Sequence, residues 1–218
     1  NATLDMVDTE FLLQIDDDNY IPSNTLDIIP FLRNRNEIGA VALGWVFPSG
    51  FLQFDAYDIE IINNYLVRTF KAGKTAQYYD GLTFLYPYDF IPNCALFKKA
   101  VFDDVRWDEK FIISGEHEDF FLSMLKRDWI FAISPSLYIY HDWGGEPEFE
   151  NHRRGIENQK SYDYLMSKWH LKGIAPRRQI SMFLEHFQWF NWMMDKHRIV
   201  KRKVITGEVM REEEMIKF

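Results

Sequence analysis

A short apolar run near the start of the sequence ends in three consecutive aspartates. Residues 10–15 read "EFLLQI", and Asp16, Asp17 and Asp18 follow directly. A run of this length, bounded by turn-forming residues, is typical of a buried strand. We therefore predict a strand over residues 10–15 whose end carries three carboxylates.

Residues 22–35, "PSNTLDIIPFLRNR", space their apolar side chains as a helix does, after a Ser-Asn pair that suits a helix cap. Pro30 weakens this prediction, because proline costs about 3 kcal/mol inside a helix. Residues 39–47, "GAVALGWVF", then indicate a second buried strand. A strand, a helix and a strand in this order predict a parallel α/β sheet.

Residues 51–70, "FLQFDAYDIEIINNYLVRTF", have two interpretations. The segments "IEII" and "YLVRTF" flank Asn63 and Asn64, a pair that favours a hairpin turn. The same residues also fit a helix, and the pattern leaves that alternative open. We prefer the hairpin.

Further elements are a strand leading into a short helix over 88–102, a helix over 116–127 and a strand over 130–141. The 116–127 helix begins with acids and ends with bases, as the helix dipole favours. From about residue 146 the sequence is helix-rich, notably over 151–169 and 179–203. We expect one α/β domain over residues 1–145 and a helical extension over 146–218 that packs on it.

Composition narrows the function classes. The net charge of −8 provides no basic field for nucleic acid, so no nucleic-acid partner is expected. The single Cys94 excludes a disulfide framework and a thiolate metal cluster, and favours a cytoplasmic location. No apolar stretch approaches the roughly 18 residues of a membrane span. Residues 183–204 join an aromatic face to a basic end; we expect them to pack on their own domain, with a peripheral membrane or a neighbouring domain as the alternative contact.

The three aspartates form the first candidate site. Ligands of open α/β sheets bind beyond the carboxyl ends of the strands. Neighbouring carboxylates raise one another's pKa unless a cation compensates, and Mg²⁺ or Mn²⁺ accept carboxylate oxygens together with phosphate oxygens. Strand geometry points Asp16 and Asp18 to one side and Asp17 to the other. A solvated acidic turn that caps the next helix is the alternative.

Two later motifs carry titratable groups. In "SGEHEDFF", residues 116–119 stand at a predicted helix start, where the dipole stabilises anions and two phenylalanines exclude water. These surroundings suit a general base, but the motif taken alone is better explained as acidic capping of the helix. His141 ends a predicted strand in "SLYIYHDWGG" and is either a metal ligand or a structural histidine.

The order and spacing of these three motifs resemble those of GT-A glycosyltransferases. Residues 91–129, from "IPNCALFKK" to "LKRDW", are similar to the acceptor side of inverting β-1,4-galactosyl- and N-acetylgalactosaminyltransferases and of family-2 enzymes. The resemblance spans roughly residues 1–145. It implies a Rossmann-like mixed sheet flanked by helices, and inverting transfer of a hexosyl or N-acetylhexosaminyl group from a nucleotide sugar, most simply a UDP-sugar, to a glycan or glycoconjugate hydroxyl.

The resemblance also implies ligands for the metal and the donor. Asp18, His141 and Asp16 would bind Mn²⁺ or Mg²⁺. Asp16, Asp17 and Asn93 would contact the donor. Asn93 stands where the galactosyltransferases carry a glycine pair, so the identity of the donor sugar does not carry over.

On the acceptor side, the resemblance implies that Asp119 is the general base, with Glu118 and His117 as alternatives. A gapless match to the galactosyltransferases places His117 at their base aspartate. Glu116, His117 and Trp143 would contact the acceptor.

One departure concerns the start of the chain. A GT-A domain opens with two strand–helix units before its aspartate motif, whereas 15 residues precede Asp16 here. We expect the nucleotide-gripping half to lie in a preceding segment. The alternative is a non-catalytic carbohydrate- or protein-binding module on a decayed transferase scaffold.

Overall fold

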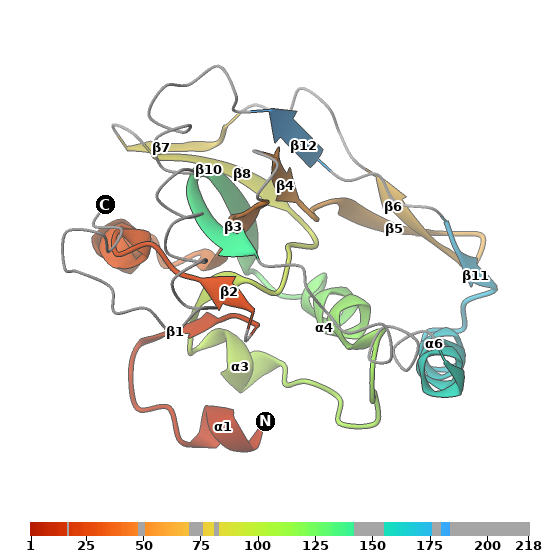
Figure 1. The fold of residues 1–218 in the computed structure, drawn as a ribbon. Coiled ribbons are helices and arrows are strands. Elements are labelled where there is room, and N and C mark those ends of the chain that lie inside the picture. Colours follow the sequence, from red (N-terminus) through yellow and green to blue (C-terminus); the bar gives the residue numbers. More distant parts are fainter. Residues whose placement is uncertain are drawn as a thin grey trace, which may run out of the picture.

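The computed structural model describes residues 1–16, 18–47, 51–69, 76–80, 83–141, 155–175 and 180–183 (Figure 1). Its main element is a mixed sheet with the strand order β1-β9-β3-β10-β8-β7. These strands are β1 (Phe11–Gln14), β9 (Ala95–Lys98), β3 (Ile38–Val46), β10 (Ile130–His141), β8 (Thr83–Tyr88) and β7 (Tyr78–Asp80). At its margins, β2 (Asn19–Tyr20) pairs with β10, β4 (Phe51–Phe54) with β3, and β12 (Ile180–Phe183) with β4.

The three predicted core strands run in the same direction. Strand β9 is antiparallel to both β1 and β3, and β10 is parallel to β3. Strands β1, β3 and β10 therefore end at a common edge of the sheet. The predicted parallel relation of the strands at 10–15 and 39–47 is confirmed, but β9 is inserted between them.

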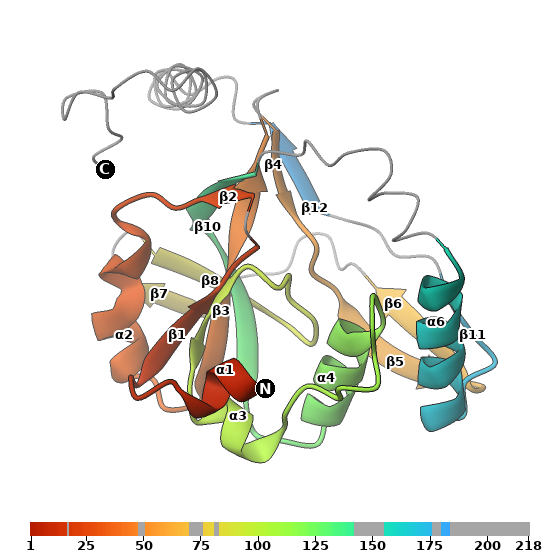
Figure 2. The ribbon, with the colours of Figure 1, turned by 60° about the horizontal axis from the view of Figure 1, so that its bottom comes forward.

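Helices cover both faces of this sheet, with α2 (Ile29–Arg33) on one side and α4 (Glu116–Met124) and α6 (Ile156–Lys168) on the other (Figure 2). On the first side, Ile28 and Leu32 pack with the buried strand residues Ile38, Val41 and Leu96. On the second side lie α3 (Val101–Asp104) and α4 (Glu116–Met124). The predicted α/β class, a mixed sheet flanked by helices, is confirmed.

Phenylalanines fill the core on the α4 side, as the aromatic content indicates. The ring of Phe120 lies 6.4 Å from that of Phe97 and 5.7 Å from that of Phe102. Phe121 meets Phe131 edge-on at 5.1 Å. Burying one such side chain contributes roughly 1.5–3 kcal/mol, so these contacts are a main reason why α4 stays on the sheet.

The single helix predicted over residues 22–35 is divided in two. A 3-10 turn, η1 (Thr25–Ile28), leads into the short helix α2 (Ile29–Arg33). Pro30 stands in the first turn of α2, where the missing N–H has no intrahelical partner to lose. The proline that weakened the prediction thus marks where the α-helix begins.

The preferred hairpin is confirmed and the helical alternative is wrong. Strands β5 (Asp58–Ile62) and β6 (Tyr65–Thr69) pair antiparallel around Asn63 and Asn64. The φ angles of these asparagines are 52° and 67°, as a tight hairpin turn requires. A third strand, β11 (Gly173–Ile174), adds parallel to β6.

Helix α6 (Ile156–Lys168) confirms most of the helix predicted over 151–169, and a single turn, α1 (Ala2–Asp5), precedes β1. The helix predicted over 179–203 is wrong at 180–183, because the edge of β4 supplies backbone partners there and the segment becomes β12. The rest of that helix, and residues 184–204, lie outside the described residues. Within the described ranges, no helix combines the length and apolar character that crossing a bilayer requires.

Gly44 tests the packing of β4 on β3. A Cβ atom at Gly44 would lie 2.4 Å from Cδ1 of Leu52 and 2.7 Å from Cζ of Phe54, two fully buried side chains. We expect Gly44→Ala to lower the free energy of unfolding by about 1–3 kcal/mol, the usual cost of overpacking. Gly173→Ala is the control, because its Cβ meets only the half-exposed ring of Tyr65, at 3.2 Å. Urea denaturation measures both; equal losses would contradict the prediction.

Candidate functional site

The candidate site lies at the edge where β1, β3 and β10 end. Strand β2 pairs with the last residues of β10, with Asn19 opposite His141. This pairing brings Asp18 to His141, with 3.4 Å between Oδ2 and Nε2. Asp18 Oδ1 is shielded from solvent and has no hydrogen-bond partner within the described ranges. Two predicted metal ligands, far apart in sequence, therefore meet.

Aromatic rings surround His141. The rings of Trp45 and Phe47, from the end of β3, stand edge-on to the imidazole at 6.0 Å and 5.7 Å. The His141 side chain is only 15% exposed, whereas that of Asp18 is 42% exposed. The histidine is therefore fixed by packing and the aspartate faces solvent.

Asn93 holds the first aspartate of the motif. Its side-chain amide donates to both carboxylate oxygens of Asp16, at 3.2 Å and 3.4 Å. The contact follows from the antiparallel register: Gln14 pairs with Ala95, so Asp16, two residues after Gln14, faces Asn93, two residues before Ala95. Two of the predicted donor-binding residues are thus brought together. Asp17 and Trp143 lie outside the described residues.

The side chains at this edge can be compared with the ligands that a metal cation requires. In the part of the chain that is described, no three His, Cys, Asp or Glu side chains converge into a ready-made metal site. Mg²⁺ and Mn²⁺ commonly take one or two protein ligands and complete their shell with phosphate oxygens and water. The Asp18–His141 pair, with the orphaned Asp18 Oδ1, fits a cation shared with a phosphate-bearing ligand.

The acidic motif begins at a glycine that turns the chain into α4. Gly115 has a φ of 86°, and a Cβ atom there would lie 3.1 Å from the ring of Phe111. After this turn, Glu116 and His117 stay partly exposed, with 3.4 Å between Oε1 and Nε2. The His117 ring meets Trp107 edge-on at 5.0 Å. Among the residues that the structure describes, none is a hydrogen-bond partner of Glu116 Oε2 or His117 Nδ1.

The next two residues of the motif are buried and paired. Asp119 is 2% exposed; it accepts hydrogen bonds from Lys168 Nζ at 2.9 Å and from Trp169 Nε1 at 2.8 Å. Glu118 is 6% exposed and pairs with Arg68 at 3.3 Å. Asp119 therefore has both oxygens engaged, and its expected role as base stays a prediction.

Lys168 joins Asp119 to a second carboxylate. Its Nζ lies 2.7 Å from Oδ2 of Asp108, which also accepts a hydrogen bond from the Tyr164 hydroxyl at 2.8 Å. Burial alone would raise the pKa of Asp108, but the hydrogen bonds from Lys168, the Lys110 N–H and Tyr164 outweigh it and lower that pKa to about 2. The pKa of Lys168 is raised in return, because its bonds to both carboxylates outweigh its own burial.

Sequence reasoning missed the basic and aromatic partners of the motif. Arg68, Lys168 and Trp169 belong to no recognisable motif, and the last two fall in the region predicted to be an extension. A buried carboxylate requires a hydrogen-bonding or basic partner, so the sequence indicates the type of residue that is needed. It does not indicate which position supplies that residue.

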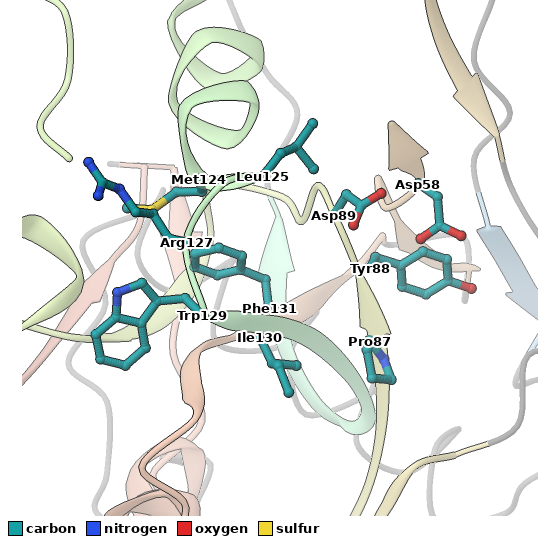
Figure 3. Close-up of a pocket in the computed structure, with 10 residues that line it drawn as sticks. All are labelled: Asp58, Pro87, Tyr88, Asp89, Met124, Leu125, Arg127, Trp129, Ile130 and Phe131. Atoms are coloured by element: carbon teal, nitrogen blue, oxygen red, sulfur yellow. The ribbon is translucent and has the colours of Figure 1, made fainter. Parts of the chain in front are cut away.

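A separate cavity of about 210 Å³ lies at the other end of the sheet, where β10 begins (Figure 3). Arg127 stands on one side of it, and Asp58, Tyr88 and Asp89 on the other. Burial, with Asp58 as the next cause, raises the pKa of Tyr88 to about 12. None of the residues predicted from the motifs lines this cavity, so it is distinct from the strand-end site.

The sequence matches no protein-family profile, and no curated protein gives a significant match. Among solved structures, the crystal structure of S. aureus TarS 1-349 matches with 14% identity and a TM-score of 0.38. The match covers 65% of this chain and 38% of the TarS chain. A TM-score this low does not establish a shared fold, so the function is drawn from the side chains of this chain.

Asp108→Asn tests the charge network around Lys168. The folded-state pKa of Asp108 is about 2, below its ordinary 3.8, so its stabilising contribution is present above about pH 4 and is lost as the pH falls through 2. We expect the variant to be less stable at pH 7 and to lose less stability than the wild type between pH 4 and pH 2. Urea midpoints across that range measure this, with the exposed Asp103→Asn as control. Parallel wild-type and Asp108→Asn curves would count against the network.

Proposed function

We propose that the protein is a GT-A-type glycosyltransferase that moves a hexosyl or N-acetylhexosaminyl group from a nucleoside-diphosphate sugar, in the first place a UDP-sugar, to a hydroxyl of a glycan or glycoconjugate. The observation that carries the proposal is the meeting of Asp18 and His141 at the carboxyl edge of β1, β3 and β10. Ligands of open α/β sheets bind at this edge. Asp16, held by Asn93, adds a second oriented carboxylate.

In this proposal Asp18 and His141 hold Mn²⁺ or Mg²⁺, and Asp16 contacts either the cation or the donor ribose. When bound, the cation supplies Lewis-acid neutralisation of the charge on the departing diphosphate. Asn93 restrains the Asp16 carboxylate, because its amide donates to both oxygens. The tight packing of His141 keeps its imidazole in place before any ligand arrives.

Asp18→Asn tests the metal assignment. We expect UDP to bind more tightly with Mn²⁺ than without it, and Asp18→Asn to weaken the Mn²⁺-dependent binding by at least about tenfold, a loss seen even for supporting residues of metal sites. Titration calorimetry measures this, and Asp27→Asn, an exposed acid of η1, is the matched control. Wild-type protein that binds UDP equally well with and without Mn²⁺ would refute the metal-dependent mechanism.

The general base of the proposal is His117. Asp119 and Glu118 are already paired with Lys168 and Arg68, whereas Nδ1 of His117 has no partner among the described residues. The acceptor oxygen attacks the anomeric carbon as the bond from that carbon to the diphosphate breaks. The hydroxyl proton passes to the imidazole, and the Glu116 carboxylate stabilises the imidazolium.

His117→Asn and Asp119→Asn separate the two candidate bases. We expect His117→Asn to lower kcat by about 10²–10⁴-fold, the usual contribution of a general base, with UDP–Mn²⁺ affinity unchanged. Turnover of a panel of UDP-sugars, with and without acceptor glycans, measures kcat, and titration calorimetry measures the affinity for UDP and Mn²⁺. If His117→Asn keeps near wild-type turnover and Asp119→Asn does not, the base is Asp119.

A further inference from the structure

Helix α6 presents a polar stripe to the segment that leads into the acidic motif. The stripe repeats every three or four residues and so forms one face of the helix. Its members are Asn158, Ser161, Tyr164 and Lys168. Each of them binds a position between 108 and 119.

The first half of the stripe binds the loop just before α4. The Ser114 hydroxyl donates to Oδ1 of Asn158. The backbone N–H of Ile112 donates to the Ser161 hydroxyl at 3.4 Å. A side chain at Gly115 would also approach the Ser161 carbonyl, at 3.6 Å. The turn that leads into the motif therefore packs against α6.

The second half of the stripe binds both ends of the segment. Tyr164 and Lys168 meet Asp108 at its beginning, and Lys168 reaches on to Asp119 in the first turn of α4. Trp169, the residue after the helix, completes the partners of Asp119. One lysine thus links Asp108, which precedes the motif, to Asp119 within it.

Both of these positions lead to His117. Asp108 follows Trp107, whose ring stands edge-on to the His117 ring at 5.0 Å and stacks on Phe120 at 4.3 Å. Asp119 lies in the same helical turn as His117. Contacts that fix Asp108 and Asp119 therefore also fix the Trp107 ring and the backbone that carries the His117 imidazole.

A second tie comes from the hairpin. Arg68 of β6 pairs with Glu118 and donates to the carbonyl of Ala175, directly after β11. Both buried acids of the motif are therefore linked to the segment 155–175. Asp119 contacts Lys168 and Trp169 directly, and Glu118 is linked indirectly, through Arg68.

We propose that Lys168 is a positioning residue for His117. In this proposal α6, which lies outside the region that resembles the transferases, holds the acceptor side of the site in its geometry. The inference rests on the proposed function for its catalytic meaning. Its structural content, that Lys168 sets the place of the His117 ring, is independent of it. Small displacements of a catalytic group lower the rate without weakening substrate binding elsewhere, because the reacting atoms need a defined geometry.

Three variants of the full chain test the inference. Lys168→Met removes the charge at similar length, Lys168→Arg retains it, and Lys160→Met removes a lysine on the outer face of α6 that pairs with Glu157. The readouts are the NMR resonances of the His117 ring, kcat/KM for the acceptor, and UDP–Mn²⁺ affinity. For Lys168→Met we expect the His117 resonances to move and kcat/KM to fall by about tenfold or more, with UDP–Mn²⁺ affinity within about twofold of wild type. Lys168→Arg restores the wild-type values, and Lys160→Met matches wild type.

Tyr164→Phe supplies a milder change if Lys168→Met does not fold. It removes only the hydroxyl that binds Asp108, and we expect it to move the His117 resonances in the same direction. His117 resonances that stay unmoved in the folded variants would overturn the inference. If they follow Lys168 while the wild type neither binds UDP nor turns over any UDP-sugar, the proposed function fails and the positioning role stands.

Discussion

The antiparallel pairing of β9 with both β1 and β3 is the constraint on which the rest of the structure depends. Leu96, in the middle of β9, pairs with Leu13 on one side and Val41 on the other. This double pairing brings β1 and β3 into one direction although they are not neighbours. It sets Asp16 opposite Asn93, and it places the end of β1 at the edge where β10 ends in His141.

The residues of the acidic motif differ in burial and in contacts, although they lie in one helical turn. Glu116 and His117 are partly exposed and contact each other, while Glu118 and Asp119 are buried against basic side chains. Removing one partner of a buried pair leaves an uncompensated charge, which is far more costly than a lost surface contact. The buried half of the motif is therefore suited to joining segments, and the exposed half to meeting a substrate.

Local patterns predicted most elements of the fold, because their causes are local. The Asn63-Asn64 turn and the strands β1 and β3 are determined by residues that are adjacent in the sequence. The prediction was wrong at 180–183, where pairing with β4 overrides the helical spacing of the side chains. Likewise, the strand-end positions of Asp18 and His141 follow from sequence, but the partners Lys168 and Arg68 depend on tertiary contacts that no single sequence displays.

The acidic motif of α4 and the aspartates at the strand edge also differ in the side chains that contact their carboxylates. Around α4, the chain supplies the guanidinium of Arg68 to Glu118 and the ammonium of Lys168 to Asp108 and Asp119. At the strand edge, the partner of Asp18 is a titratable imidazole, and that of Asp16 is the neutral amide of Asn93. In the proposed function, a cation from outside supplies at the strand edge the positive charge that Arg68 and Lys168 supply beside α4.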